Sequence, residues 1–175
     1  MRESVFQGEW KRSIEEYFGE FKGFHYVKIP DTPKFSGSLI PYSPPRPYDC
    51  YLLHSGKFRA YELKMHKSLT GFPFGNVSDN QIDNLVEVAN AGGKGYVVIN
   101  YRKSDVSENH IKKYNLKGKR FNIVYAIPIF EFLKLRDITY DDRGSIPFDF
   151  FLNHEESLVS DIERQGQIWD VVQVL

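Results

Sequence analysis

Two carboxylates and a lysine lie close together in a stretch of the sequence that has the pattern of a β-hairpin. In Tyr48–His66, two apolar and aromatic-rich runs flank a central Ser55-Gly56 pair, which is typical of a two-residue turn. Pairing of the two runs about this turn places Asp49 directly opposite Glu62. Lys64 follows two residues after Glu62 and therefore lies on the same face of the hairpin. The pattern predicts one small cluster of two acids and one base.

The chemistry of such a cluster depends on its burial. Two opposed carboxylates repel each other, and the cost increases in a buried sheet. A divalent cation beside Lys64 would offset this repulsion, and Mg²⁺ is commonly held by one or two carboxylates together with several waters. Alternatively, this end of the hairpin is exposed and Lys64 forms a surface ion pair that contributes little to stability. The hairpin pattern leaves both interpretations open.

The surrounding sequence predicts the elements that position this cluster. An apolar stripe of Trp10, Ile14, Tyr17, Phe18 and Phe21 predicts a helix over Gly8–Phe21. A proline-rich segment at about 30–47 is expected to be a protruding loop. The other predicted elements are a strand at Phe24–Ile29, a helix from Ser78 to Ala91, strands at Gly95–Tyr101 and Phe121–Ile127, a short helix after Pro128 and a helix near Glu156–Arg164. The strand–helix–strand order after the hairpin predicts a parallel strand pair.

Length and composition restrict the class of protein. The 175 residues have no net charge and are 41% hydrophobic, which is typical of a single globular domain over 1–175. One cysteine, Cys50, cannot form an intramolecular disulfide, which fits a reducing compartment. Apolar runs are too short to span a bilayer and the first residues lack an apolar signal core, so we expect a cytoplasmic protein without membrane contact.

The zero net charge is a sum of opposite parts. Residues 102–120 contain seven basic and two acidic side chains, a net charge of +5, whereas the tail from about 137 is acidic. A local basic segment can bind the phosphate backbone of DNA. The predicted contacts in this segment are Arg102, Lys103, Lys112, Lys113, Lys117, Lys119 and Arg120. The alternative is a solvated lysine-rich loop without a partner.

The wider sequence resembles a known group of nucleases. Asp49, Glu62 and Lys64 fit the D…(D/E)-x-K pattern of the PD-(D/E)XK superfamily. The sequence from Val5 to Phe151 resembles the RecU-type Holliday junction resolvases, in particular their shorter phage-borne and prophage-borne relatives. The segments that carry this resemblance are FQGEWKRSI, DTPKF, YDCYLL with YELKMHKS, FPFGNVSDNQIDNL, GGKGYVVINYR, VYAIPIFEFL and RGSIPFDFF.

The resemblance implies a fold and an activity. The fold would be a restriction-endonuclease-like α/β core, with a mixed central β-sheet flanked by helices. The activity would be Mg²⁺-dependent cleavage of four-way DNA junctions by paired phosphodiester hydrolysis, with Mn²⁺ as a substitute metal and no nucleotide cofactor. Paired cuts imply a homodimer. The protein would act in the cytoplasm of a bacterial host and be phage or prophage encoded. The protruding loop, with Arg46 at its end, would enter the junction.

The resemblance also implies residue roles. Asp49 and Glu62 would bind the metal, and Lys64 would orient the attacking water and stabilise charge on the phosphate. Gln81 matches a glutamine near the metal, although Ser78-x-x-Gln81 is also a capping box that favours glutamine for structural reasons.

The N-terminal helix departs from the family pattern. The family has a glutamate directly after the N-terminal phenylalanine, but here Gln7 follows Phe6. Glu9 is the nearest carboxylate and is a candidate for the missing catalytic acid. Gln7 could instead contribute its carbonyl oxygen, and Glu9 could be an acid favoured by the helix dipole.

Three other functions stay open at the level of sequence. The protein could be an endonuclease acting on duplex or damaged DNA. It could be a junction-binding module with weak or no cleavage, because of Gln7. It could also be an aromatic-rich interaction domain in which the Asp49, Glu62 and Lys64 cluster is an exposed ion pair.

Overall fold

The structure is a computed structural model, and it describes residues 3–20, 23–30, 45–153, 160–162, 164–165 and 168–175. Its strands are β1 (Phe24–Lys28), β2 (Cys50–His54), β3 (Lys57–His66), β4 (Phe72–Pro73), β5 (Lys94–Lys103), β6 (Phe121–Pro128), β7 (Ser145–Ile146), β8 (Ser160–Ile162), β9 (Arg164–Gln165) and β10 (Ile168–Trp169). Its α-helices are α1 (Glu3–Phe18), α2 (Asp79–Asn90), α3 (Glu108–Tyr114), α4 (Ile129–Lys134) and α5 (Phe148–Asn153). Short helical turns cover Phe74–Asn76, Leu135–Thr139, Asp141–Arg143 and Val172–Val174.

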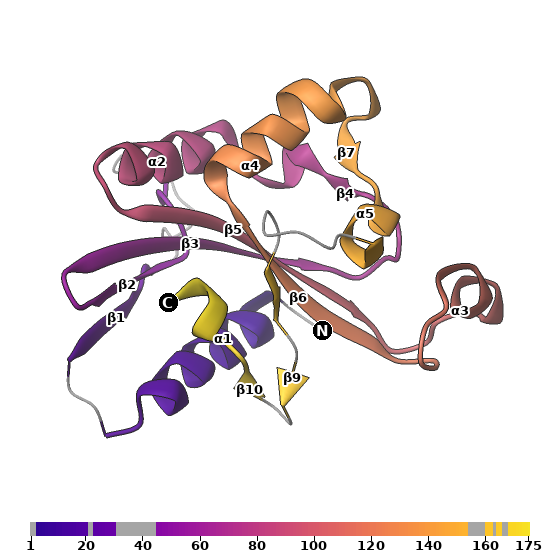
Figure 1. Ribbon diagram of the computed structural model, residues 1–175, viewed down its shortest axis with the longest axis horizontal. Helices are drawn as coiled ribbons and strands as arrows, with labels where there is room; N and C mark the ends of the chain where they lie inside the picture. Colours follow the sequence, from indigo (N-terminus) through magenta and orange to yellow (C-terminus); the bar gives the residue numbers. More distant parts are fainter. Residues whose placement is uncertain (1–2, 21–22, 31–44, 154–159, 163, 166–167) are drawn as a thin grey trace, which may run out of the picture.

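The centre of the molecule is a mixed sheet with the order β1-β2-β3-β5-β6-β8. Only β3 and β5 pair in parallel, and the remaining neighbours in this sheet are antiparallel. Helices α2, α4 and α5 cover one face, while α1 and the C-terminal segment cover the other (Figure 1). This arrangement confirms the predicted mixed α/β fold with helices flanking a central sheet.

The β2–β3 hairpin forms in the predicted register. Cys50 pairs with Tyr61 and His54 pairs with Lys57. Ser55 and Gly56 both have left-handed backbone conformations, with φ of 51° and 71°. Such a turn follows the right-handed twist of the two strands, which favours a two-residue connection. One residue before β2, the amide of Asp49 still donates to the carbonyl of Tyr61 over 3.1 Å.

The crossover from β3 to β5 also follows the prediction. Ser78 caps α2, with its hydroxyl accepting from the Gln81 amide, and the helix ends at Asn90. The first turn is therefore defined by a polar side chain and the last by the glycines that follow. In the resulting parallel pair, Glu62 lies beside Val97 and His66 beside Tyr101.

Helix α1 begins and ends earlier than the apolar stripe indicated. It starts at Glu3, and its buried residues Phe6, Trp10, Ile14 and Phe18 recur every four positions. Tyr17 is half exposed, because it lies beside the stripe of buried residues and not within it. The predicted helix residue Phe21 lies outside the described residues.

Two predictions for irregular regions were wrong. The basic segment predicted as a loop contains α3, which Ser107 caps and which ends at Asn115 in a left-handed conformation. Of the predicted helix near Glu156–Arg164, residues 156–159 and 163 lie outside the described residues, and Ser160–Ile162 form the strand β8, which pairs with the edge of β6. Pairing along a sheet edge stabilises a strand through contacts with residues far away in the sequence, and local helix propensity does not reveal such contacts. The predicted protruding loop falls mostly on residues 31–44, outside the described residues.

The C-terminal segment belongs to the core on the α1 face. Trp169, Val171 and Val174 are buried with Phe6 and Trp10. The amide of Trp169 donates to the Ser13 hydroxyl over 2.8 Å. The end of the acidic tail therefore helps to fix α1 on the sheet. None of the described helices offers a stretch long and apolar enough to cross a membrane.

Candidate active site

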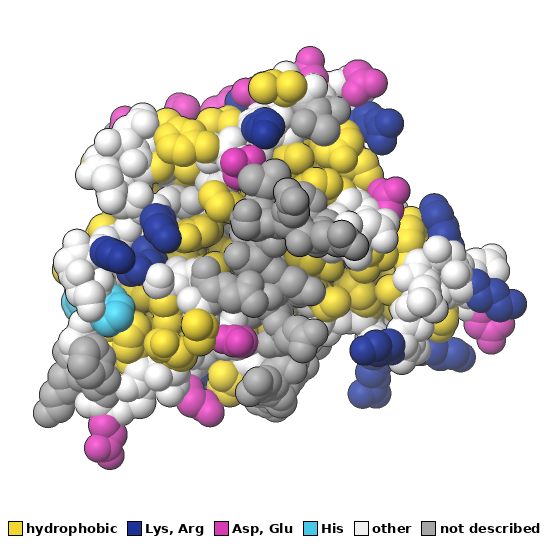
Figure 2. All heavy atoms as spheres, viewed as in Figure 1, with side chains coloured by type: hydrophobic (Ala, Val, Ile, Leu, Met, Phe, Trp, Pro, Cys, Tyr) yellow, Lys and Arg dark blue, Asp and Glu magenta, His cyan; other side chains and the backbone are white. Residues whose placement is uncertain are grey.

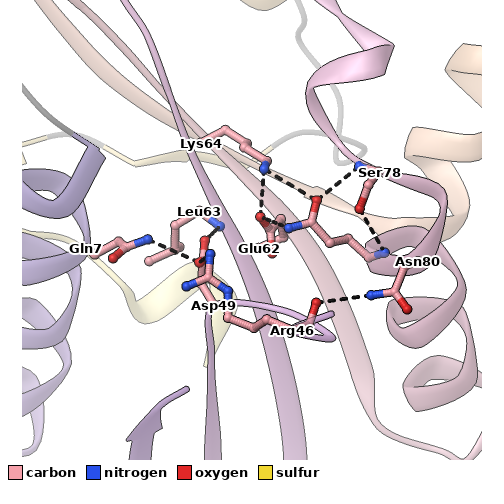
Figure 3. A network of polar contacts seen from close by, with 9 residues as sticks. Gln7, Arg46, Asp49, Glu62, Leu63, Lys64, Ser78 and Asn80 are labelled. Carbon is pink, nitrogen blue, oxygen red and sulfur yellow. Dashed lines mark hydrogen bonds and ion pairs between the residues drawn. The ribbon is translucent and has the colours of Figure 1, made fainter. Parts of the chain in front are cut away.

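Asp49 lies one residue before β2 and is fully buried (Figure 3). The main-chain amide of Leu63 donates to its Oδ2 over 2.7 Å. Its Oδ1 forms an ion pair with Arg46 at 2.7 Å and accepts from the Gln7 amide at 3.1 Å. Three separate elements, the segment before β2, the neighbouring strand and α1, thus orient one carboxylate.

Glu62 lies in the middle of β3 and is also fully buried. Lys64 Nζ is 2.8 Å from its Oε1, and the Gln81 side-chain amide donates to the same oxygen over 2.6 Å. Its other oxygen, Oε2, is buried without a hydrogen-bond partner among the described residues. A buried carboxylate oxygen without a donor is costly, which makes Oε2 an obvious ligand position.

The surroundings of Glu62 favour its neutral form. Burial and, to a smaller extent, the negative charge of Asp49 raise the pKa of Glu62 to about 7, although Lys64 partly counteracts both. The two carboxylates therefore disfavour each other's charge, as their opposition across the hairpin predicted. A cation at this point would remove the conflict.

Lys64 supplies the fixed positive charge of the cluster. Its ammonium group is mostly buried and lies between Glu62 Oε1 and Gln81 Oε1, the latter at 3.4 Å. The exposed-ion-pair interpretation therefore does not describe this cluster, because neither carboxylate reaches solvent.

Gln81 fulfils both roles that its position in the sequence left open. Its Oε1 accepts from the Ser78 amide over 3.0 Å, which completes the capping box of α2. Its Nε2 meanwhile donates to Glu62. One side chain therefore begins the helix and also positions the buried carboxylate.

In α1, Gln7 and not Glu9 reaches Asp49. Gln7 is buried and donates through its amide nitrogen. Glu9 is also buried, but it forms a two-point ion pair with Arg102, whose nitrogens lie 2.5 and 3.3 Å from the two carboxylate oxygens. No contact joins Glu9 to Asp49 or Glu62 in the described part of the chain.

The predicted DNA-binding residues fall into two groups. Arg46 and Arg102 are mostly buried and face carboxylates, Asp49 in one case and Glu9 in the other. The lysines of α3 and its following turn are exposed, on a lobe that projects beyond the sheet (Figures 1 and 2). The exposed group comprises Lys112, Lys113, Lys117, Lys119 and Arg120, with Lys103 half-buried at the end of β5.

The donor atoms suit a hard divalent cation held by few protein ligands. Asp49 and Glu62 offer carboxylate oxygens, and no other group in the described part of the chain contacts Glu62 Oε2 through a hydrogen bond. Within the described residues, no group of three or more His, Cys, Asp or Glu side chains is present. Mg²⁺ fits such a site, because it retains several waters and takes its other oxygens from substrate phosphate. A zinc site would require more ligands.

Two contacts of the site were missed from the sequence. The ion pair between Arg46 and Asp49 spans only three residues, but the segment around Pro47 has no periodicity from which to infer it. The main-chain donor at Leu63 could have been inferred from the hairpin register, which places this strand beside Asp49.

Comparison with known proteins gives limited information. No family model and no curated protein matches the chain. Among solved structures, it is similar to the 1.6 Å structure of Hjc from Archaeoglobus fulgidus, described as a Holliday junction resolvase from an archaeal hyperthermophile. The match covers 71% of this chain and 78% of that chain, at 16% identity and a TM-score of 0.37. So distant a likeness carries no weight for the activity of this protein.

Proposed function

We propose that this protein is a Mg²⁺-dependent endonuclease that cleaves branched DNA, with the four-way junction as its substrate. The observation that carries this proposal is the buried opposition of Asp49 and Glu62, with Lys64 at 2.8 Å from Glu62 Oε1 and with Oε2 unpartnered among the residues that the structure describes. If Glu62 and Lys64 formed only a structural ion pair, Asp49 would weaken it, because the charge of Asp49 raises the pKa of Glu62.

Asp49 and Glu62 would hold the metal. Bound there, Mg²⁺ would supply Lewis-acid stabilisation of the phosphate charge and an acidified water as nucleophile. Lys64 would place its ammonium group beside the phosphate and stabilise the negative charge that develops on it. Gln81 would keep Glu62 and Lys64 in position, since it contacts both.

The choice of the four-way junction rests on the sequence resemblance to RecU-type resolvases. Resolution requires two cuts on opposing strands, and a two-fold homodimer places two such sites symmetrically. A DNA substrate of this kind would place the protein in the cytoplasm of a bacterial cell, and the resemblance to the shorter relatives favours a phage or prophage gene.

The test compares the unaltered protein with Asp49→Asn on a synthetic four-way junction in Mg²⁺. We expect Asp49→Asn to bind the junction and to lose cleavage, because the buried amide keeps its shape but loses the charge that holds the metal. Linear duplex of the same sequence is the substrate control. Equal cleavage of junction and duplex would contradict the choice of substrate.

A second candidate is a junction-binding module that cleaves weakly or not at all. Two contacts favour it: an amide of Gln7 occupies the side of Asp49 where the family pattern has an acid, and Arg46 already neutralises Asp49. A junction that is bound tightly but stays intact in both Mg²⁺ and Mn²⁺ would favour this function.

A further inference from the structure

A cavity of about 800 Å³ lies between α3, the start of β6 and α5, apart from the Asp49–Glu62 site. Residues 113–117, 120–123, Asp149, Leu152 and Asn153 line it. Its volume is within the range of roughly 300–1,000 Å³ that is typical of small-molecule pockets. Figure 2 shows hydrophobic side chains between the body of the molecule and the lysine-bearing lobe of α3.

The lining combines an apolar surface with a positive rim. Leu116, Phe121, Ile123 and Leu152 supply apolar atoms. Three cations, Lys113, Lys117 and Arg120, face one carboxylate, Asp149, and all four of these side chains are exposed. Such a cavity is complementary to a ligand that joins a flat apolar group to an anion. A nucleotide has both parts, in its base and its phosphate.

The cavity lies near the proposed cleavage site. His66, two residues after Lys64 on the same face of β3, pairs with Tyr101 of β5, and Tyr101 pairs with Ile123 of the cavity wall. Ile123 therefore lies two strand spacings, about 10 Å, across the sheet and two residues, about 7 Å, along it from Lys64, which is about 12 Å in all. At about 3.4 Å per nucleotide along one strand, this distance corresponds to about three to four nucleotides. One DNA strand can therefore reach both places.

We propose that this cavity binds one unpaired nucleotide of the DNA strand, with the base against the apolar lining and the phosphate at the cationic rim. The proposal rests on the proposed function, since it concerns the strand bound at Lys64. A paired base cannot enter without the cost of unstacking and unpairing, whereas an unpaired base at a branch point can. The cavity would thereby favour branched over perfect duplex DNA.

The test uses Asp49→Asn protein in EDTA, so that no DNA is cut. Two probes are compared by fluorescence anisotropy: a duplex with a single bulged 2-aminopurine nucleotide and the fully paired duplex without it. Contact of one base with the lining adds to affinity, so we expect the bulged duplex to bind about tenfold more tightly. The fluorescence of the bulged 2-aminopurine should also change on binding.

Matched double variants separate the cavity from the general charge of the lobe. Lys113→Gln with Lys117→Gln alters two lining residues, whereas Lys112→Gln with Lys119→Gln removes the same charge from neighbouring positions outside the lining. The first pair should abolish the preference for the bulge and the 2-aminopurine signal. The second pair should weaken binding of both probes equally and leave the preference intact.

Equal affinity for the two probes would overturn the proposal, and so would identical effects of the two double variants on the preference. These outcomes are independent of the nuclease test. If the protein cleaves junctions in an Asp49-dependent way but has no preference for the bulge, only the proposed nucleotide site is contradicted. If Lys113→Gln with Lys117→Gln abolishes a bulge preference but the protein cleaves no DNA, only the proposed nuclease activity is contradicted.

Discussion

At the scale of single residues, the site is defined by an imbalance of charge around Glu62. Its two oxygens differ completely: Oε1 meets Lys64 and Gln81, while Oε2 meets nothing among the described residues. Burial and Asp49 together outweigh the attraction of Lys64 and raise the pKa. The ionised folded state is thus under strain that a bound cation would relieve.

This imbalance predicts how stability depends on pH. Because the folded-state pKa of Glu62 is about 7 against 4.5 for the unconstrained group, the native state binds the extra proton between these values. Stability from this group is complete below pH 4.5 and is lost as pH rises through 7, by on the order of 3 kcal/mol. Glu62→Gln carries no such proton. In metal-free buffer, the free energy of unfolding measured in urea should therefore increase for Glu62→Gln, relative to the unaltered protein, as the pH rises from 5 to 8.

The control for this experiment is Glu16→Gln, an exposed position on α1. It should follow the pH profile of the unaltered protein. A difference between the Glu62→Gln and unaltered proteins that is constant across this pH range would contradict the assigned cause.

Arg46 leads to a second prediction at this scale. Its guanidinium occupies the Oδ1 side of Asp49 at 2.7 Å, so it competes with a cation for the same carboxylate. Arg46→Gln should therefore bind Mg²⁺ about tenfold more tightly, since loss of an adjacent positive charge is worth about 1–2 kcal/mol. The rise in melting temperature with Mg²⁺ concentration measures this. Arg120→Gln, which removes the same charge far from Asp49, should leave the metal affinity unchanged.

At the scale of elements, α1 is attached to the sheet at two polar points. Gln7 reaches Asp49 before β2, and Glu9 reaches Arg102 at the end of β5. The first point belongs to the site. The second lies in a buried network that continues to Asn122 and Asn100. Glu9 therefore acts on α1 placement, and nothing in these contacts gives it direct access to substrate.

This assignment predicts the effect of Glu9→Gln. Removal of one partner leaves Arg102 buried with an uncompensated charge, which costs about 3 kcal/mol or more. The double variant Glu9→Leu with Arg102→Met removes both charges and should recover most of this loss in urea unfolding. Per folded molecule, junction cleavage by the double variant should match the unaltered protein. A cleavage loss as complete as that of Asp49→Asn would instead make Glu9 a catalytic residue.

Elements whose ends carry local signals were predictable from sequence. The hairpin register followed from Ser55-Gly56, and α2 followed from its capping box. The opposition of Asp49 and Glu62 came directly from that register. By contrast, β8 depends on an open sheet edge, and α3 is so short that its apolar face carries too few residues to show periodicity. Arg46 was recognised as basic, but its contact with Asp49 depends on a bend of the chain that no pattern encodes.

At the scale of the whole molecule, positive charge is separated from the site that would use it. Four exposed lysines, Lys112, Lys113, Lys117 and Lys119, gather on the α3 lobe at the end of the sheet, while the cluster around Glu62 lies inside it (Figures 2 and 3). A protein without net charge can in this way carry a local positive field at one edge.

This separation predicts the salt dependence of binding. Each phosphate contact contributes about 0.9 to the slope of log K against log salt. Glutamine at Lys112, Lys113, Lys117 and Lys119 together should reduce the slope for junction DNA by up to about 3.6. Glutamine at the exposed Lys11, Lys28, Lys57 and Lys94 removes equal charge elsewhere and should leave the slope nearly unchanged. Equal slopes for the two quadruple variants would show that the lobe is solvated without contacting DNA.

The shared use of Gln81 has a consequence for protein engineering. One amide both completes the first turn of α2 and positions Glu62, so the helix cannot slide or rotate without moving the buried carboxylate. The smallest portable unit is therefore the hairpin together with the start of α2, and not the strands alone. A graft that copied only the two acids and the lysine into another sheet would leave Glu62 with one donor fewer and with a free choice of rotamer.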